Sequence, residues 1–112
     1  MNLTDRIYVI ENNLDIFGEI IPTEEVALDC REFSRQLINN NMTSSSMENR
    51  YELKVYIPYR RTEPYASFGK KEYTLFRYED VIYELVMKVS VKDFFGKMHH
   101  YEITLRELRD AE

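Results

Sequence analysis

The chain has 112 residues, 44% of them hydrophobic, which is enough for one modest core and too little for two. Its formal net charge of −5 argues against general attraction to nucleic acid or anionic lipid. No run approaches the roughly 20 apolar residues of a membrane helix, and no apolar signal-peptide region opens the sequence. One cysteine excludes an internal disulfide framework and suits a reducing compartment. We therefore expect a single domain over residues 1–112 that has no membrane partner.

The N-terminal segment Asp5–Glu11 contains a β-branched and aromatic run that is typical of a short strand. Apolar residues also fall at helical spacing here, but β-branched side chains crowd a helix, so a strand is favoured. Turn-prone residues follow as far as Gly18, and any regular element before Pro22 is expected to end there.

Residues 23–39 fit two structures. Their apolar residues make a helical stripe, which periodicity alone favours: Val26, Ala27, Cys30, Phe33 and Leu37. The same segment also alternates as a strand would: Val26, Leu28 and Cys30, continued by Phe33, Arg35 and Leu37. One bulge near Arg31 and Glu32 would join the two halves of this strand. From the residues alone, both the helix and the strand remain open.

The middle of the chain alternates loops and strands. Residues 39–49 are small, polar and without periodicity, which predicts a long exposed loop. Residues 51–57 alternate as a strand that ends at Pro58. Residues 60–70 contain Pro64 and Gly69 and form a second long loop, before a candidate strand over 72–78.

The segment Tyr83–Leu105 predicts two long strands joined by a turn that contains Gly96. The first strand alternates over nine residues, with one apolar face made by Tyr83, Leu85, Met87, Val89 and Val91. The second has its apolar face at Tyr101, Ile103 and Leu105. Because such a ribbon cannot stand alone in water, other strands or a helix must cover it. Residues 106–112 are expected to form a charged tail.

Side chains that could carry chemistry are few. His99 and His100 are adjacent, but neighbours on a strand point to opposite faces. Only His100 and Glu102 would therefore share a face, and two ligands do not make a metal site. Cys30 is expected to be a buried, inert thiol. The sequence has no glycine-rich phosphate loop and no serine elbow. We therefore expect no enzyme activity, no catalytic residue, no metal or other cofactor, and no small-molecule substrate.

Several pieces of the chain occur in the order of a known family. The N-terminal pieces are Asp5-Arg6-Ile7-Tyr8-Val9-Ile10, Leu14-Asp15-Ile16-Phe17-Gly18-Glu19 and Val26-Ala27-Leu28-Asp29-Cys30-Arg31. The C-terminal pieces are Asp80-Val81-Ile82, Tyr83-Glu84-Leu85-Val86, Asp93-Phe94-Phe95-Gly96 and His99-His100-Tyr101-Glu102-Ile103-Thr104-Leu105. In this order they resemble the small head–tail joining proteins of long-tailed bacteriophages, also called head-completion, stopper or minor capsid proteins.

The resemblance implies a mainly β fold, a small antiparallel β-barrel with long loops, and hence a strand rather than a helix after Glu25. The alternative is an α+β fold, in which one helix at about 24–39 packs on a four-stranded antiparallel sheet. The resemblance also marks structural motif residues: Cys30, Arg31, Asp80, His99, His100, Tyr101 and Glu102.

The function that the resemblance implies is that of a structural virion protein of the head–tail connector. Copies form a ring below the portal and adaptor, close the DNA channel after packaging, and offer a docking surface to the tail. The expected partners are copies of the chain itself, the portal and adaptor proteins, the tail terminator and the packaged DNA. The expected location is the virion, which is assembled in the host cytoplasm. The candidate channel loop is Asn39, Asn40, Asn41, Met42, Thr43, Ser44, Ser45 and Ser46.

Charge is unevenly divided along the chain. Residues 1–49 carry nine acidic and three basic side chains, a net −6, whereas residues 50–112 carry eleven and twelve, a net +1. One interpretation is that the acidic half faces the channel and discourages DNA from adhering to its wall. The alternative function is a small acidic phage or mobile-element inhibitor that imitates DNA and blocks a host nuclease or repair enzyme, although −5 over 112 residues is mild for a mimic.

Overall fold

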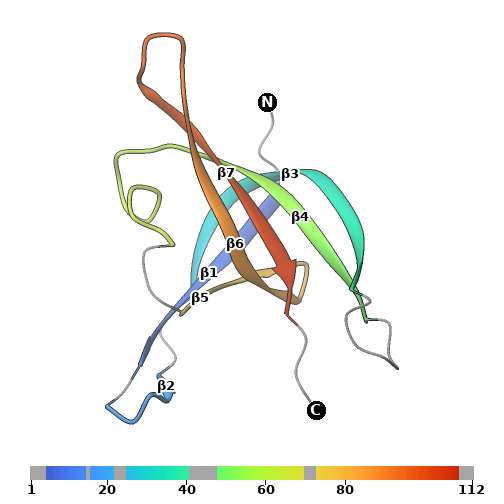
Figure 1. Ribbon diagram of the computed structural model, residues 1–112. Helices are drawn as coiled ribbons and strands as arrows, with labels where there is room; N and C mark the ends of the chain where they lie inside the picture. The colour runs from blue at the N-terminus through green and yellow to red at the C-terminus, as the bar shows by residue number, and fades with distance from the viewer. Residues whose placement is uncertain (1–4, 15, 22–24, 41–47, 70–72, 109–112) are drawn as a thin grey trace.

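The structure is a computed structural model that describes residues 5–14, 16–21, 25–40, 48–69 and 73–108 (Figure 1). These residues form seven strands: β1 Asp5–Leu14, β2 Ile20–Ile21, β3 Glu25–Asn40, β4 Glu48–Pro58, β5 Tyr73–Tyr78, β6 Val81–Lys92 and β7 Met98–Glu107. No helix in the described part of the chain has the length and apolarity to cross a membrane.

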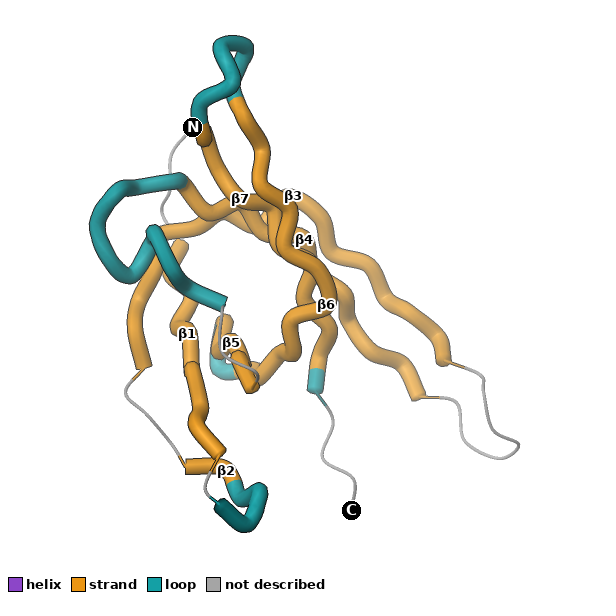
Figure 2. Tube along the Cα trace, turned by 60° about the vertical axis from the view of Figure 1, so that its left-hand side comes forward, coloured by secondary structure: helices purple, strands orange, loops and turns teal. Residues whose placement is uncertain are grey.

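All neighbouring strands run antiparallel in the order β2-β1-β3-β4-β7-β6-β5. A further pairing of β1 with β5 closes β1, β3, β4, β7, β6 and β5 into a six-stranded barrel, with β2 attached to β1 outside it (Figure 2). The predicted fold class, a small antiparallel β-barrel, is therefore confirmed, and the α+β alternative is wrong. Closure pairs strand edges that an open sheet would leave exposed.

The disputed segment is the long strand β3, so the helical stripe in the sequence is misleading. Leu28 and Cys30 point into the barrel and are fully buried. The register against β4 shifts between Glu32 and Ser34, which leaves Phe33 as the extra residue of a bulge. The expected bulge is thus confirmed, slightly further along the chain than predicted.

Strand alternation fills the barrel with aliphatic and aromatic side chains. The fully buried side chains, each less than 2% exposed, include Ile7, Val9, Leu28, Leu53, Val55, Ile57, Phe76, Ile103 and Leu105. Their mutual packing removes apolar surface from water, which is the main stabilising contribution to such a domain. Tyr101, from the predicted motif, is also part of this core.

The apolar face predicted for β6 is correct only for its first half. The register against β7 shifts between Leu85 and Met87, so Val86 is the extra residue of a second bulge. Because a bulge exchanges the two faces of a strand, Met87 and Val89 lie 55% and 43% exposed, while Lys88 turns inward. The bulge therefore moves apolar side chains to the outside of the barrel.

The connection over residues 60–69, predicted as part of a long loop over 60–70, contributes to the core. Tyr65 and Phe68 are 8% and 2% exposed. The Tyr65 hydroxyl accepts a hydrogen bond from the Asp29 backbone N–H at 2.9 Å. The Phe68 ring makes edge-to-face contacts with Phe76 and Tyr101. This segment therefore covers the barrel interior, although its ends and its arginines lie at the surface.

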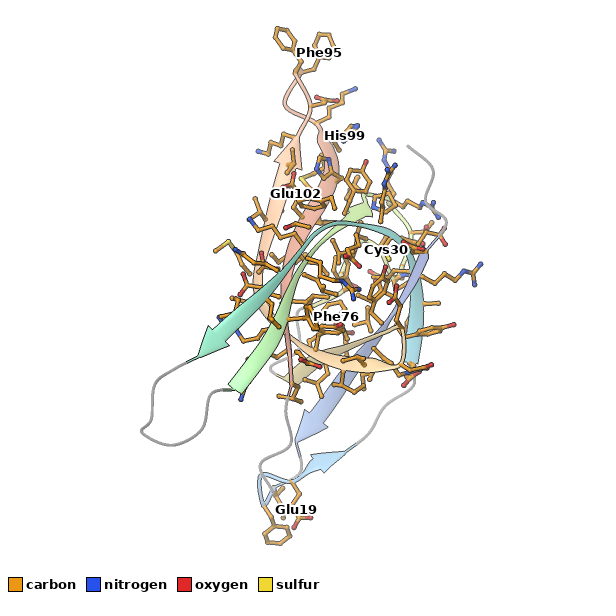
Figure 3. All side chains as sticks on the ribbon, turned by 90° about the vertical axis from the view of Figure 1, so that its right-hand side faces the viewer. Glu19, Cys30, Phe76, Phe95, His99 and Glu102 are labelled. Atoms are coloured by element: carbon orange, nitrogen blue, oxygen red, sulfur yellow. The ribbon has the colours of Figure 1, made fainter. Side chains whose placement is uncertain are left out.

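Two hairpins extend beyond the barrel in different directions. The β6–β7 hairpin rises at the top of Figure 1, and the β3–β4 hairpin runs toward the lower right. The short β1–β2 hairpin lies at the bottom, opposite the β6–β7 tip in all three views (Figures 1–3). Strand β7 continues to Glu107, so residues 106 and 107 of the predicted tail belong to a strand.

Candidate functional site

The predicted Cys30-Arg31 pair has one side chain inside the barrel and one outside. Cys30 is fully buried. Burial, and secondarily the negative charges of Asp5, Asp29 and Glu32, raise its pKa to about 12. Arg31 lies opposite Tyr56 on β4 and is exposed. The thiol is therefore a core group that resists ionisation, and the arginine is available at the outer surface.

The two histidines lie together on the outer surface, contrary to the prediction that they face opposite ways. His99 is the extra residue where the β6–β7 register shifts near Lys92, and the two Nδ1 atoms are 2.7 Å apart. The His100 ring stacks on Tyr56 with centroids 4.3 Å apart, and its Nε2 lies 2.9 Å from Glu102 Oε2. The described residues contain no group of three or more potential ligands placed to hold a metal. This arrangement fixes a polar surface patch.

Asp80 lies in the turn between β5 and β6. Glu79 and Asp80 have φ of 49° and 63°, the left-handed conformation that a two-residue hairpin turn requires. The Asp80 carboxylate is 3.7 Å from Arg77 Nη1. Aspartate, with its short polar side chain, adopts this backbone region more readily than most residues do. Its position in a motif is thus explained by turn geometry.

The structure places only the base of the candidate channel loop. Asn39 and Asn40 end β3, opposite Asn49 and Glu48 of β4. The other members of the loop, Asn41, Met42, Thr43, Ser44, Ser45 and Ser46, lie outside the described residues. The described part of the β3–β4 hairpin extends beyond the barrel and ends at Asn40 and Glu48 (Figure 2).

Part of the acidity of the N-terminal half is neutralised by arginines. Glu25 binds Arg77, whose hydrogen bond lowers the pKa of Glu25. Asp29 lies 3.7 Å from Arg6 Nε and 3.4 Å from Arg60 Nη2. These pairs reduce the negative field that either an acidic channel wall or a DNA mimic would need.

The most exposed of the large apolar side chains lie at hairpin tips. Phe94 and Phe95, at the β6–β7 tip, are 96% and 84% exposed (Figure 3). Ile16 and Phe17, at the opposite end of the molecule, are 92% and 84% exposed. The sequence predicts both segments only as turns, although paired large apolar residues in a turn are a visible signal.

Two strands have free edges within the described residues. Strand β3 pairs with β1 only through Cys30, and beyond that point it bonds to β4 alone. Strand β6 pairs with β5 only through Glu84, and beyond that point β7 is its one partner strand among the described residues. Unpaired backbone groups along such edges are templates for pairing with another chain.

An open hollow of about 520 Å³ lies at the base of the β6–β7 hairpin. Its lining consists of Tyr59, Arg60, Arg61, Lys97 and Met98. Three of these five side chains are cationic, so the hollow favours an acidic group over an apolar one.

The chain is thus a small closed antiparallel barrel that carries projecting hairpins with apolar tips and free strand edges. No family model and no curated protein matches the sequence. The fold is similar to that of a chain in the solved virion of a native gene transfer agent particle, with a TM-score of 0.67 and 11% sequence identity. The alignment covers 96% of this chain and 97% of the other, so the two share one complete architecture.

Proposed function

We propose that the chain is a structural virion protein of the head–tail connector, which forms a ring below the portal and adaptor. The observation that carries the proposal is the end-to-end fold similarity to a chain of a gene transfer agent virion. This fold similarity agrees with the resemblance of the sequence motifs to head–tail joining proteins, which does not depend on the fold. In this role the protein has no catalytic task, closes the channel over packaged DNA, and provides a surface for the tail terminator.

The two free edges support ring formation. A ring needs a heterologous contact, in which two different surfaces of one subunit bind each other on neighbouring copies. Strands β3, β4, β7 and β6 are four consecutive antiparallel strands, so β3 and β6 at their outer edges run in opposite directions. A neighbour in the same orientation would therefore present its β3 antiparallel to β6, which is the more favourable pairing.

The side chains beside these edges suit an interface. The outward apolar residues of β6, Met87 and Val89, lie next to its free edge. Phe33 and Leu37 of β3 are 48% and 52% exposed. Burying such residues between copies removes apolar surface from water.

The candidate channel loop fits the same ring. Strands β3 and β4, which flank it, run together away from the barrel as far as Asn40 and Glu48. Residues 39–46 carry no charge, so copies crowded at an axis would repel little. Their hydroxyl and amide groups could pair between subunits and close the channel.

The test is assembly of the purified protein, alone and with the portal–adaptor complex of the same particle. Light scattering after size exclusion should show a ring on that complex. The variant Met87→Lys/Val89→Lys, which charges the β6 edge, should not assemble. The control Phe17→Lys charges a still more exposed apolar residue away from both edges and should assemble normally. A wild-type protein that does not bind the portal–adaptor complex and stays monomeric would overturn the proposal.

A further inference from the structure

The tip of the β6–β7 hairpin exposes two aromatic rings at one end of the molecule (Figure 3). The rings of Phe94 and Phe95 contact each other edge to face, with centroids 5.6 Å apart and planes at 87°. Each ring otherwise lies in solvent, where it contributes nothing to the core of its own domain. Exposed aromatic residues of this kind are typical anchors of protein–protein interfaces.

The turn beneath the rings is held by four hydrogen bonds. The Asp93 Oδ1 atom accepts bonds from the backbone N–H groups of Phe95 and Lys97, at 2.8 and 2.9 Å. The Asp93 N–H donates to the Lys97 carbonyl, and the Gly96 N–H donates to the Asp93 carbonyl. Gly96 supplies the φ of +80° that closes the turn. The rings are therefore presented on an ordered support, which lowers the entropic cost of binding.

The charge around the tip is positive. Lys92 and Lys97 flank the turn, and both are exposed. The carboxylate of Asp93, which lies between them, is directed at backbone donors of the turn. An apolar pair flanked by two lysines is complementary to an apolar pocket with an acidic rim.

We propose that this tip is an anchor that inserts into an acidic-rimmed apolar pocket of a neighbouring protein layer of the particle. The inference rests on the proposed connector function, because that function places a different protein above and below the ring. The tip lies at one end of the molecule, opposite the β1–β2 hairpin, so a single neighbouring protein would bind it (Figures 1 and 3).

The chemistry favours another protein over a second copy of this chain. The hollow at the base of the same hairpin is lined by Arg60 and Arg61, whose charges would oppose Lys92 and Lys97. The chemistry also favours a protein over a lipid surface, because two rings bury little apolar area and the chain has a net charge of −5.

Two probes test the proposal: heads that carry portal and adaptor but lack this protein, and isolated tails. The variant Phe94→Ser/Phe95→Ser should keep the wild-type unfolding midpoint and oligomeric state. It should lose at least about a hundredfold in affinity for one probe, since each buried ring contributes roughly a tenfold factor or more. The control Ile16→Ser/Phe17→Ser removes a similar pair at the opposite end and should retain that same binding.

The charge of the tip is tested separately. Lys92→Glu/Lys97→Glu should slow the association with the same probe, most strongly at low salt.

Three results would overturn the inference while leaving the connector function standing. The Phe94→Ser/Phe95→Ser variant could bind both probes as the wild type does. It could fail to assemble with itself, which would make the tip a contact between copies. The wild type could bind phosphatidylcholine–phosphatidylglycerol vesicles in a manner that needs both rings, which would make the tip a membrane anchor. A wild-type protein that binds neither heads nor tails would instead refute the connector function, and the inference with it.

Discussion

Replacing Phe68 with alanine tests whether the segment over residues 60–69 is part of the barrel core. Phe68 is 2% exposed, and its ring contacts Phe76 and Tyr101 edge to face at centroid distances of 6.4 and 5.2 Å. The Lys88 ammonium lies 3.9 Å from the ring centroid, and its Nζ donates a hydrogen bond to the Phe68 carbonyl at 2.5 Å. The substitution removes the ring and leaves a cavity at the barrel mouth, while the backbone carbonyl remains.

The expected loss follows from core truncation. Phe→Ala changes in close-packed interiors cost about 3–5 kcal/mol of unfolding free energy, and a cation–π contact contributes about 0.5–1 kcal/mol within such a total. With an m-value of about 2 kcal/mol/M in urea, the unfolding midpoint should fall by about 2 M. The matched control is Phe94→Ala, the same chemical change at a side chain that is 96% exposed. It should change the free energy by no more than about 0.5 kcal/mol.

Urea unfolding at one fixed protein concentration measures both variants. The chain has nine tyrosines and no tryptophan, so tyrosine fluorescence and far-ultraviolet circular dichroism are the suitable signals. Equal midpoints for Phe68→Ala and Phe94→Ala would refute the reasoning, because they would show that the loop lies on the barrel without being packed into it.

Three further outcomes are expected. Cys30, with a pKa raised to about 12, should react with a thiol reagent only as the protein unfolds, and rapid labelling of the folded protein would contradict its burial. Gly96→Ala should lower the unfolding free energy in urea by about 1 kcal/mol, because alanine disfavours a φ of +80°. The added Cβ meets no atom within 4 Å, so the backbone conformation alone causes the loss. An unchanged unfolding midpoint would show that the turn relaxes. Glu25→Gln should lower stability at neutral pH, because Arg77 holds the pKa of Glu25 below its ordinary 4.5. The ionised Glu25 carboxylate stabilises the fold above pH 4.5, and this stabilisation is lost as the pH falls through the lowered pKa of Glu25. The unfolding midpoints of the wild type and of Glu25→Gln should therefore converge in acid.

The strands with clean alternation could be predicted from the sequence because alternation reflects burial directly. The inward residues of β4 and β7, such as Leu53, Ile57 and Ile103, are fully buried as their spacing indicates. Strand β3 could not be derived from periodicity. Its first half alternates toward the core and its second half forms an exposed hairpin, so the whole segment has a spurious helical period, and the motif resemblance was needed to identify the strand.

The bulges and the covering loop explain the other differences. No residue type at Val86 or His99 marks a bulge, because a register shift depends on the partner strand as well as on the strand itself. The aromatic residues Tyr65 and Phe68 lie in a segment without periodicity, so only the folded barrel shows that they are covered. Among the candidate functional residues, Phe94 and Phe95 were recognised only as part of a turn, since exposure is a property of the finished hairpin.

The double pairing of β1 has a consequence for how the nascent chain folds. Strand β1 leaves the ribosome early and can pair with β3 soon afterwards, but its second partner, β5, lies more than half the chain length further on. Contacts between such distant segments slow folding, because a long loop must be closed before they form. During synthesis, one edge of β1 therefore remains open until Tyr73–Tyr78 has emerged. A chain truncated before that strand should expose this edge and aggregate.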